Sequence, residues 1–269
     1  MADYIDLNGA QTWYDERGTG EPVVLLHGGL SDSRDFTGNL DALADRFRLL
    51  MPERRGHGHT PDVPGPFAAD ALADDTAAFI EKIADGPVRL AGYSAGAVVA
   101  LRTAVRRPDL VERLALISGA FDPDGMILRP SLDAPPPLPL LEAYAEVSPD
   151  GASHFGEVIA KVVRSVEEDR PLTAKELAVV TCPALVMTAD DDFISFEHTI
   201  AMYRALGPTL RSSRRGSTTA CPLTRRTATS SASSSPPRGS RPATPPSAST
   251  TPPRSTTARC GRPPSPSRS

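Results

Sequence analysis

One serine in this chain stands in a pattern that could make it a nucleophile. Gly92-Tyr93-Ser94-Ala95-Gly96 matches G-x-S-x-G, follows an apolar run and opens a stretch of small residues typical of a helix. A sharp strand-to-helix turn needs glycines so that its serine hydroxyl can stand exposed above a sheet. The other interpretation is a glycine-rich turn whose serine only caps the helix. The pattern and its setting together favour a nucleophilic Ser94.

A second glycine pattern could stabilise negative charge. His27-Gly28-Gly29 ends an earlier apolar run. Glycines at the end of a strand let backbone N–H groups approach a developing oxyanion, together with the N–H of the residue that follows the nucleophile. The two patterns would therefore cooperate in acyl transfer if the fold brings them to one edge of a sheet.

The elements that would position these residues alternate between strands and helices. The pair Asn8-Gly9 is a strong hairpin signal between two short strands. Solid apolar runs such as Val23-Val24-Leu25-Leu26 are typical of strands buried on both faces. Alternation of this kind implies a mostly parallel sheet with helices on both faces. The expected strands are 4–7, 11–15, 22–26, 47–51, 88–91, 114–117 and 183–188, and the expected helices of the sheet region are 39–46, 68–84, 95–106 and 196–206.

The order of these motifs resembles the α/β-hydrolase superfamily, and more narrowly its capped, esterase-like members. The resemblance rests on the two glycine patterns, on Arg55-Gly56-His57-Gly58 after the next strand, on residues 108–114, and on a late strand that ends in acidic residues. It covers residues 1–206. It implies the α/β-hydrolase fold, with nucleophile Ser94 and with the backbone N–H groups of Gly29 and Ala95 as the oxyanion hole.

The resemblance also implies a carboxylate after the late strand. Thr188-Ala189-Asp190-Asp191-Asp192 aligns with the family's H-G-x-x-D pattern. The orienting acid is then Asp192, with Asp191 as the alternative. Asp190 is better interpreted as part of a solvated loop.

The catalytic histidine of the family is not identified in this chain. A serine hydroxyl is a poor nucleophile until a neighbouring base accepts its proton, and the family supplies that base in a loop after the last strand. The five histidines are His27, His57, His59, His154 and His198, and none lies at the required distance after Asp192. We expect His27 to be structural, His57 and His59 to belong to a structural loop near Ser94, and the other two to serve packing or the surface.

Changes in the hydrophobic pattern divide the chain into four predicted segments. Residues 1–120 are predicted to form the first part of the hydrolase core, and residues 182–206 the second part. The excursion 121–181, with helices expected at 140–147 and 156–168, is too long for a structureless loop and predicts a small helical cap. Residues 207–269 are expected to be a disordered tail that leaves the core incomplete, because they contain almost no apolar side chains.

The tail has the composition expected of a shifted reading frame. From Arg211 to Ser269 every residue except Leu223 is Ser, Pro, Thr, Ala, Arg, Gly or Cys, whose codons carry C or G in the middle position. Twenty-six arginines against three lysines indicate a GC-rich gene, in which a frameshift would move third-position G or C into the middle. Read back in the other frame, residues 218–222 permit His-Gly-Leu-Pro, which would supply the lost histidine. We therefore expect a frameshifted tail and an impaired enzyme.

Charge and cysteine content narrow the possible partners. All 33 acidic residues precede the tail, so the body is acidic, which argues against nucleic acid as its partner. No basic stretch leads into an apolar run near Met1, and no window approaches the ~18 apolar residues of a membrane span. We therefore expect a cytoplasmic protein without a membrane partner. No motif requires an organic cofactor, and the three cysteines lack metal-ligand spacing.

The sequence thus predicts a serine hydrolase that acts on a small ester or related acyl substrate through an acyl-serine intermediate. The same fold hosts esterases, lactonases, thioesterases and perhydrolases, so the reaction subtype, like the oligomeric state, stays open. The alternative is a non-catalytic binding protein that uses the pocket under the cap, with the Arg/Ser/Pro tail as an interaction arm.

Overall fold

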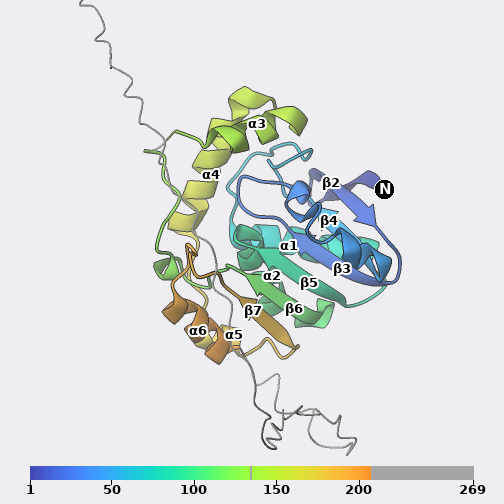
Figure 1. Cartoon of the computed structure of the whole chain (residues 1–269), viewed down its shortest axis with the longest axis vertical. Coiled ribbons are helices and arrows are strands. Elements are labelled where there is room, and N and C mark those ends of the chain that lie inside the picture. The colour runs from blue at the N-terminus through green and yellow to red at the C-terminus, as the bar shows by residue number, and fades with distance from the viewer. Residues whose placement is uncertain (134, 207–269) are drawn as a thin grey trace, which may run out of the picture. The chain divides into compact units, whose positions relative to one another are not determined.

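The computed structural model describes residues 1–133 and 135–206 (Figure 1). A seven-stranded sheet has the order β1-β2-β4-β3-β5-β6-β7. The first two strands are antiparallel, and β3 to β7 run parallel to one another. The strands are β1 Ala2–Leu7, β2 Ala10–Arg17, β3 Glu21–Leu26, β4 Phe47–Pro52, β5 Val88–Tyr93, β6 Val111–Ile117 and β7 Ala184–Met187. Every strand expected from the sequence is present, and the α/β-hydrolase fold is confirmed.

The N-terminal hairpin forms for the reason that its sequence suggests. Asn8 has a φ of 53° and Gly9 a φ of 85°. Two successive residues with positive φ make a turn whose twist matches that of the flanking strands, and Asn-Gly is the pair that adopts it at least cost. Leu7 and Ala10 consequently face each other across the hairpin.

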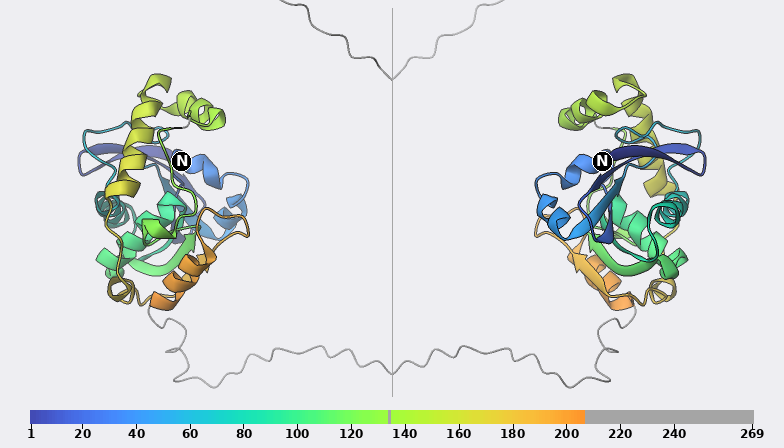
Figure 2. Two further views of the ribbon diagram at one scale, coloured as in Figure 1. Left: turned by 90° about the vertical axis from the view of Figure 1, so that its left-hand side faces the viewer. Right: turned by 90° about the vertical axis from the view of Figure 1, so that its right-hand side faces the viewer.

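The two faces of the sheet bury different sets of side chains. On β3, Val24 and Leu26 belong to a cluster with α1 (Ala69–Ile83) and α2 (Ala95–Arg106), whereas Val23 and Leu25 pack with Phe36 and with side chains of β4. Figure 2 shows helices on both sides of the sheet. This is the arrangement expected of strands that are apolar at every position. The helices of the sheet region are α1 Ala69–Ile83, α2 Ala95–Arg106 and α6 Phe196–Ala205.

One segment that was expected to be an α-helix forms a 3-10 helix instead. The segment expected as a helix at 39–46 contains a five-residue 3-10 helix, η2 Asp41–Asp45, and a shorter 3-10 helix, η1 Ser33–Phe36, precedes it. None of the residues of η2 is buried, and no side chain caps its first turn. Without a buried face or a cap, a segment of this length has little to stabilise a full α-helix.

Residues 121–181 form helices outside the sheet, as the sequence predicts. They are α3 Leu138–Val147, α4 Phe155–Glu168 and α5 Ala174–Leu177. Buried polar contacts tie this region to the sheet region. Asp62 accepts from Lys161 Nζ at 2.6 Å and lies 2.9 Å from His154 Nε2, and Asp169 accepts from the first N–H of α1. The assignment of 121–181 as a cap stays a prediction.

The predictions for the tail, including disorder and a shifted frame, concern residues 207–269, which lie outside the described residues. Within residues 1–206, excluding 134, no helix is long and apolar enough to cross a membrane.

Candidate active site

The G-x-S-x-G segment forms a tight turn between β5 and α2. Ser94 has a φ of 52° and a ψ of −118°, a conformation that a residue with a side chain rarely adopts. A Cβ on Gly92 would lie 2.2 Å from the Gly96 carbonyl oxygen, and a Cβ on Gly96 would lie 2.1 Å from the Leu26 carbonyl oxygen. Both glycines are therefore required by close backbone contacts, and the turn holds Ser94 at the carboxyl end of the sheet.

The two backbone groups expected to form the oxyanion hole are neighbours. A Cβ built on Gly29 would lie 3.5 Å from the Cβ of Ala95, although 65 positions separate the two residues. No hydrogen bond within the described residues uses the N–H of either one. Their arrangement leaves both donors available to a group bound next to Ser94.

Polar contacts of the Gly28 N–H and the Gly28 carbonyl hold the turn that carries Gly29. Asp35 accepts from the Gly28 N–H at 3.0 Å. The Gly28 carbonyl accepts from Arg54 Nη2 at 2.6 Å and from His27 Nδ1 at 2.8 Å. His27 Nε2 in turn accepts from the Arg54 backbone N–H, which fixes the tautomer of the imidazole. His27 is fully buried and has the structural role expected of it.

Asp192 is the acidic residue of the late loop that the structure holds in place. Its Oδ2 accepts from the Ser118 hydroxyl at 2.6 Å, from Thr188 Oγ1 at 3.0 Å and from the Ala189 N–H at 3.1 Å. Burial alone would raise the pKa of Asp192, but these hydrogen bonds outweigh it and hold the pKa below its usual value. Asp191 is exposed and accepts no hydrogen bond within the described residues. The geometry thus favours Asp192 over its alternative as an ionised, oriented carboxylate.

A cavity of about 700 Å³ lies next to these groups. It is lined mainly by apolar side chains from the ends of the strands and from α4. Its polar lining includes the serine, the proposed acid and two buried arginines. The residues used below are Gly29, Arg54, Ser94, Ala95, Arg102, Ser165 and Asp192. A volume of this size accommodates a small organic molecule.

None of the five histidines, all of which the structure describes, hydrogen-bonds Ser94. His59 lies 3.0 Å from Glu53 and stacks on Trp13. His154 contacts Asp62, and His198 accepts from the Phe121 N–H at 3.1 Å and stacks on the Phe121 ring at 4.2 Å. These three histidines thus contact carboxylates, a backbone N–H and aromatic rings rather than Ser94, and their assignment as structural, packing or surface residues stays a prediction.

His57 differs because one of its ring nitrogens has no partner. It is buried, lines the cavity, and its Nδ1 lies 3.0 Å from the Arg55 carbonyl oxygen, so Nδ1 carries the proton. Nε2 has no hydrogen-bond partner within the described residues. Burial and the adjacent Arg54 lower the pKa of His57 to about 3. A base of such low affinity for protons is poorly suited to accept one from a serine near neutral pH.

Three polar residues of this site are not among those predicted from the sequence. Ser118 has a φ of 54° and follows β6 directly, and Thr188 follows β7; both lie at strand ends, where such groups gather. Arg54 precedes the Arg-Gly-His-Gly pattern and is only 8% exposed. A polar residue just after an apolar run was the available signal in all three cases.

Among the described residues, no cluster of three or more histidine, cysteine, aspartate or glutamate side chains could hold a metal ion.

Comparison with known proteins gives a family for this arrangement. A model described as "Alpha/beta hydrolase family" matches residues 23–225. The chain belongs to the α/β-hydrolase family. The match spans the turn at Ser94, both strands that flank it and the loop that carries Asp192.

Individual relatives of this chain are distant. The chain is 25% identical over 204 residues to the (E)-2-((N-methylformamido)methylene)succinate hydrolase of Acinetobacter baylyi, which covers 69% of this chain and 78% of that protein. It is 38% identical over 101 residues to the pimeloyl-[acyl-carrier protein] methyl ester esterase of Chromobacterium violaceum, but that match spans 38% of each protein. A thermophilic esterase from Thermogutta terrifontis has a similar structure, with a TM-score of 0.62, 24% identity, and coverage of 78% of this chain and 87% of that one.

Proposed function

We propose that the body of this chain is a serine hydrolase site for a small ester or related acyl substrate, impaired by the lack of a catalytic histidine. Ser94 attacks the acyl carbon, the N–H groups of Gly29 and Ala95 stabilise the oxyanion, and Asp192 would orient a histidine. The observation that carries the proposal is the strained turn at Ser94 beside two unused N–H groups. Hydrolases and an esterase among the relatives support acyl transfer as the reaction class.

The missing base determines how the proposal is tested. Without a histidine, the proton of the Ser94 hydroxyl has no acceptor within the site, so acylation is slow. Free imidazole that diffuses into the cavity can take that role. We expect hydrolysis of 4-nitrophenyl acetate to become faster with added imidazole beyond the uncatalysed reaction of imidazole itself, and to saturate as the cavity fills.

Two variants make the test specific for Ser94. Ser94→Ala should abolish the imidazole-dependent turnover and the labelling of the protein by a 4-nitrophenyl phosphonate. Ser165→Ala is the matched control, because Ser165 lines the same cavity and donates only to the Val162 carbonyl at 2.8 Å. Turnover comparable with that of an intact family member without imidazole would contradict the proposal, as would labelling that survives Ser94→Ala.

The alternative function, reversible binding without chemistry, is favoured by one observation: the cavity is well formed although no histidine of the described residues hydrogen-bonds Ser94. Tight binding of an acyl compound without turnover or labelling, with and without imidazole, would support that alternative. The interaction arm that it includes lies outside the described residues.

A further inference from the structure

Arg54 is a buried cation near the oxyanion turn, where the carboxylate of Asp35 attracts its charge without forming a salt bridge. Its side chain follows β4, is 8% exposed and forms no salt bridge within the described residues. Its Nε and Nη1 also have no hydrogen-bond partner there. Burial lowers the pKa of Arg54 to about 10, so the side chain stays protonated at neutral pH. Burying an unpaired charge is costly, and replacement by an apolar side chain would often be neutral or stabilising.

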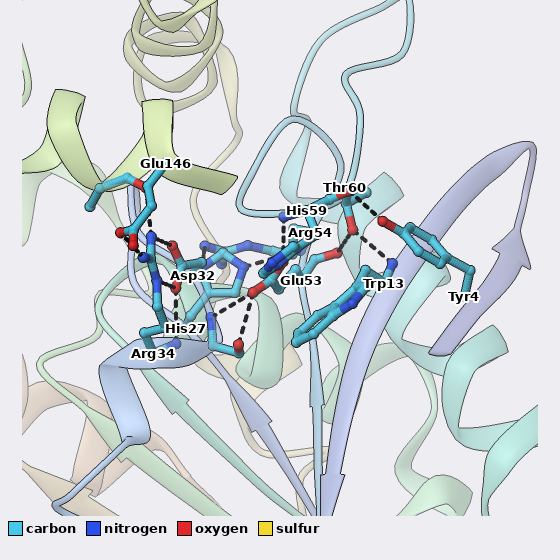
Figure 3. Close-up of polar contacts among 12 residues, drawn as sticks. Tyr4, Trp13, His27, Asp32, Arg34, Glu53, Arg54, His59, Thr60 and Glu146 are labelled. Carbon is cyan, nitrogen blue, oxygen red and sulfur yellow. Dashed lines mark hydrogen bonds and ion pairs between the residues drawn. The ribbon is translucent and has the colours of Figure 1, made fainter. Parts of the chain in front are cut away.

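The one side-chain donor that Arg54 does use points at the oxyanion turn. Nη2 donates to the Gly28 carbonyl at 2.6 Å, and the His27 ring donates to the same oxygen at 2.8 Å. Figure 3 draws Arg54 beside His27, whose Nε2 accepts from the Arg54 backbone N–H at 3.1 Å. Arg102, the other buried arginine of the cavity, instead pairs with Asp70 at 2.7 Å. The contrast indicates that the unpaired charge of Arg54 has a role at the turn.

The geometry of a peptide bond links this contact to Ser94. The Gly28 carbonyl and the Gly29 N–H belong to one planar, trans peptide unit, so they point in opposite directions. Donors that hold the oxygen therefore also fix the direction of the N–H, and a cation at the oxygen end strengthens the N–H as a donor by polarising the unit. The Gly29 N–H has no partner within the described residues and lies next to Ala95.

We infer that Arg54 is a positioning residue for the oxyanion hole, which orients and polarises the Gly28–Gly29 peptide so that its N–H stabilises charge developing beside Ser94. The inference rests on the proposed function. It assigns Arg54 a contribution to the rate of acyl or phosphonyl transfer and none to the binding of uncharged ligands.

The test uses the full chain and the rate of phosphonylation by a 4-nitrophenyl phosphonate with added imidazole. In this reaction Ser94 Oγ forms a bond to phosphorus, 4-nitrophenolate leaves, and the hydroxyl proton passes to imidazole. We expect Arg54→Met to lower the limiting rate by about tenfold to a hundredfold, less than the roughly 10²–10³-fold loss when an oxyanion donor is itself removed, because the Gly29 N–H is still present. The reagent concentration at half-maximal rate should change less than about threefold.

Stability separates this role from a merely structural one. Because Arg54→Met removes an unpaired buried charge, the midpoint of thermal unfolding should stay unchanged or rise while the rate falls. Arg54→Lys keeps the charge and should recover part of the lost rate. Arg48→Met is the control, since Arg48 also donates to a backbone carbonyl, that of Ile83 at 3.1 Å, but far along the sheet from Ser94 in a pair with Glu16.

The possible outcomes distinguish failure of this inference from failure of the proposed function. Labelling of Ser94 at the same rate in Arg54→Met and in the unaltered chain would overturn the inference and leave the proposed function standing. A fall in the rate that accompanies a lower unfolding midpoint in both Arg54→Met and Arg54→Lys would also overturn it, in favour of a structural role. If the unaltered chain is not labelled at all, the proposed function fails, and this inference fails with it.

Discussion

At the scale of single residues, the turn at Ser94 requires two glycines, because a side chain at either position would clash with the backbone. Gly92 and Gly96 each lie where a methyl group would meet a carbonyl oxygen at 2.1–2.2 Å. Neither glycine is selected for a positive φ, since neither has one. Close packing of backbone against backbone is the reason for both.

Gly96→Ala should therefore destabilise the fold by about 3 kcal/mol, the cost of forcing atoms into a filled space. The matched control is Gly156→Ala in α4, where an added methyl meets nothing within 4 Å; it should be neutral or stabilise by up to about 1 kcal/mol. Urea unfolding followed by circular dichroism measures both. Equal effects of the two substitutions would show that the close contact at Gly96 is not real.

The buried imidazole of His57 makes stability depend on pH. Its pKa is about 3 in the folded protein, below the ~6.5 of an exposed histidine. The unfolded chain binds the proton more tightly, so stability is lost as pH falls from about 6.5 towards 3.

Between pH 6 and pH 5, His57→Gln should remove up to about 1.4 kcal/mol per pH unit from the slope of the unfolding free energy. Denaturant titrations of both proteins at several pH values give the two slopes. Parallel slopes would mean that His57 is not held neutral in the folded state.

At the scale of elements, the helices between β6 and β7 pack on the sheet region through buried apolar side chains and through an ionic contact at Asp62. Asp62, at 7% side-chain exposure, contacts both Lys161 of α4 and His154. A salt bridge that loses one partner leaves the other charge buried and uncompensated.

Asp62→Asn should thus cost roughly 3 kcal/mol and increase hydrogen exchange and proteolysis within α4. Asp124→Asn is the control, because the pair of Asp124 with Arg129 is exposed on both sides; its effect should stay within about 0.5 kcal/mol. If exchange in α4 is the same in both variants, the contact at Asp62 does not hold that helix.

At the scale of the whole molecule, we propose that residues 207–269 arise from a shifted reading frame. From Arg211 onward every residue except Leu223 has C or G in the middle of its codons, and we expect the family's histidine to be encoded there in the other frame. Re-reading the DNA at codons 203–212 should reveal a missing or extra base.

A chain translated from the corrected gene should contain a histidine after Asp192 and hydrolyse 4-nitrophenyl acetate at least about 10³-fold faster than the present chain, because loss of the base of a triad costs at least this much. Ser94→Ala in the corrected chain is the control. An intact gene, together with a protein whose measured mass matches the present sequence, would remove the frameshift explanation.

Local sequence patterns were enough to predict the strands, the hairpin, the serine turn and the order of the motifs. Apolar runs, Asn-Gly and G-x-S-x-G act on their immediate neighbours, and so the helix at 95–106 was predicted to the residue. The helix expected at 39–46 was wrong, since its type depended on burial that the segment does not obtain.

What the sequence alone determined about this protein was its family, its candidate nucleophile and the absence of a histidine in the expected place. Only the tertiary structure showed that Asp192, and not Asp191, is held by hydrogen bonds, and it revealed the contact of Arg54 with the Gly28 carbonyl. The physical reason is that these choices depend on hydrogen bonds between the ends of different parallel strands. Such strands lie side by side in the sheet but far apart along the chain, where no local pattern records the contact.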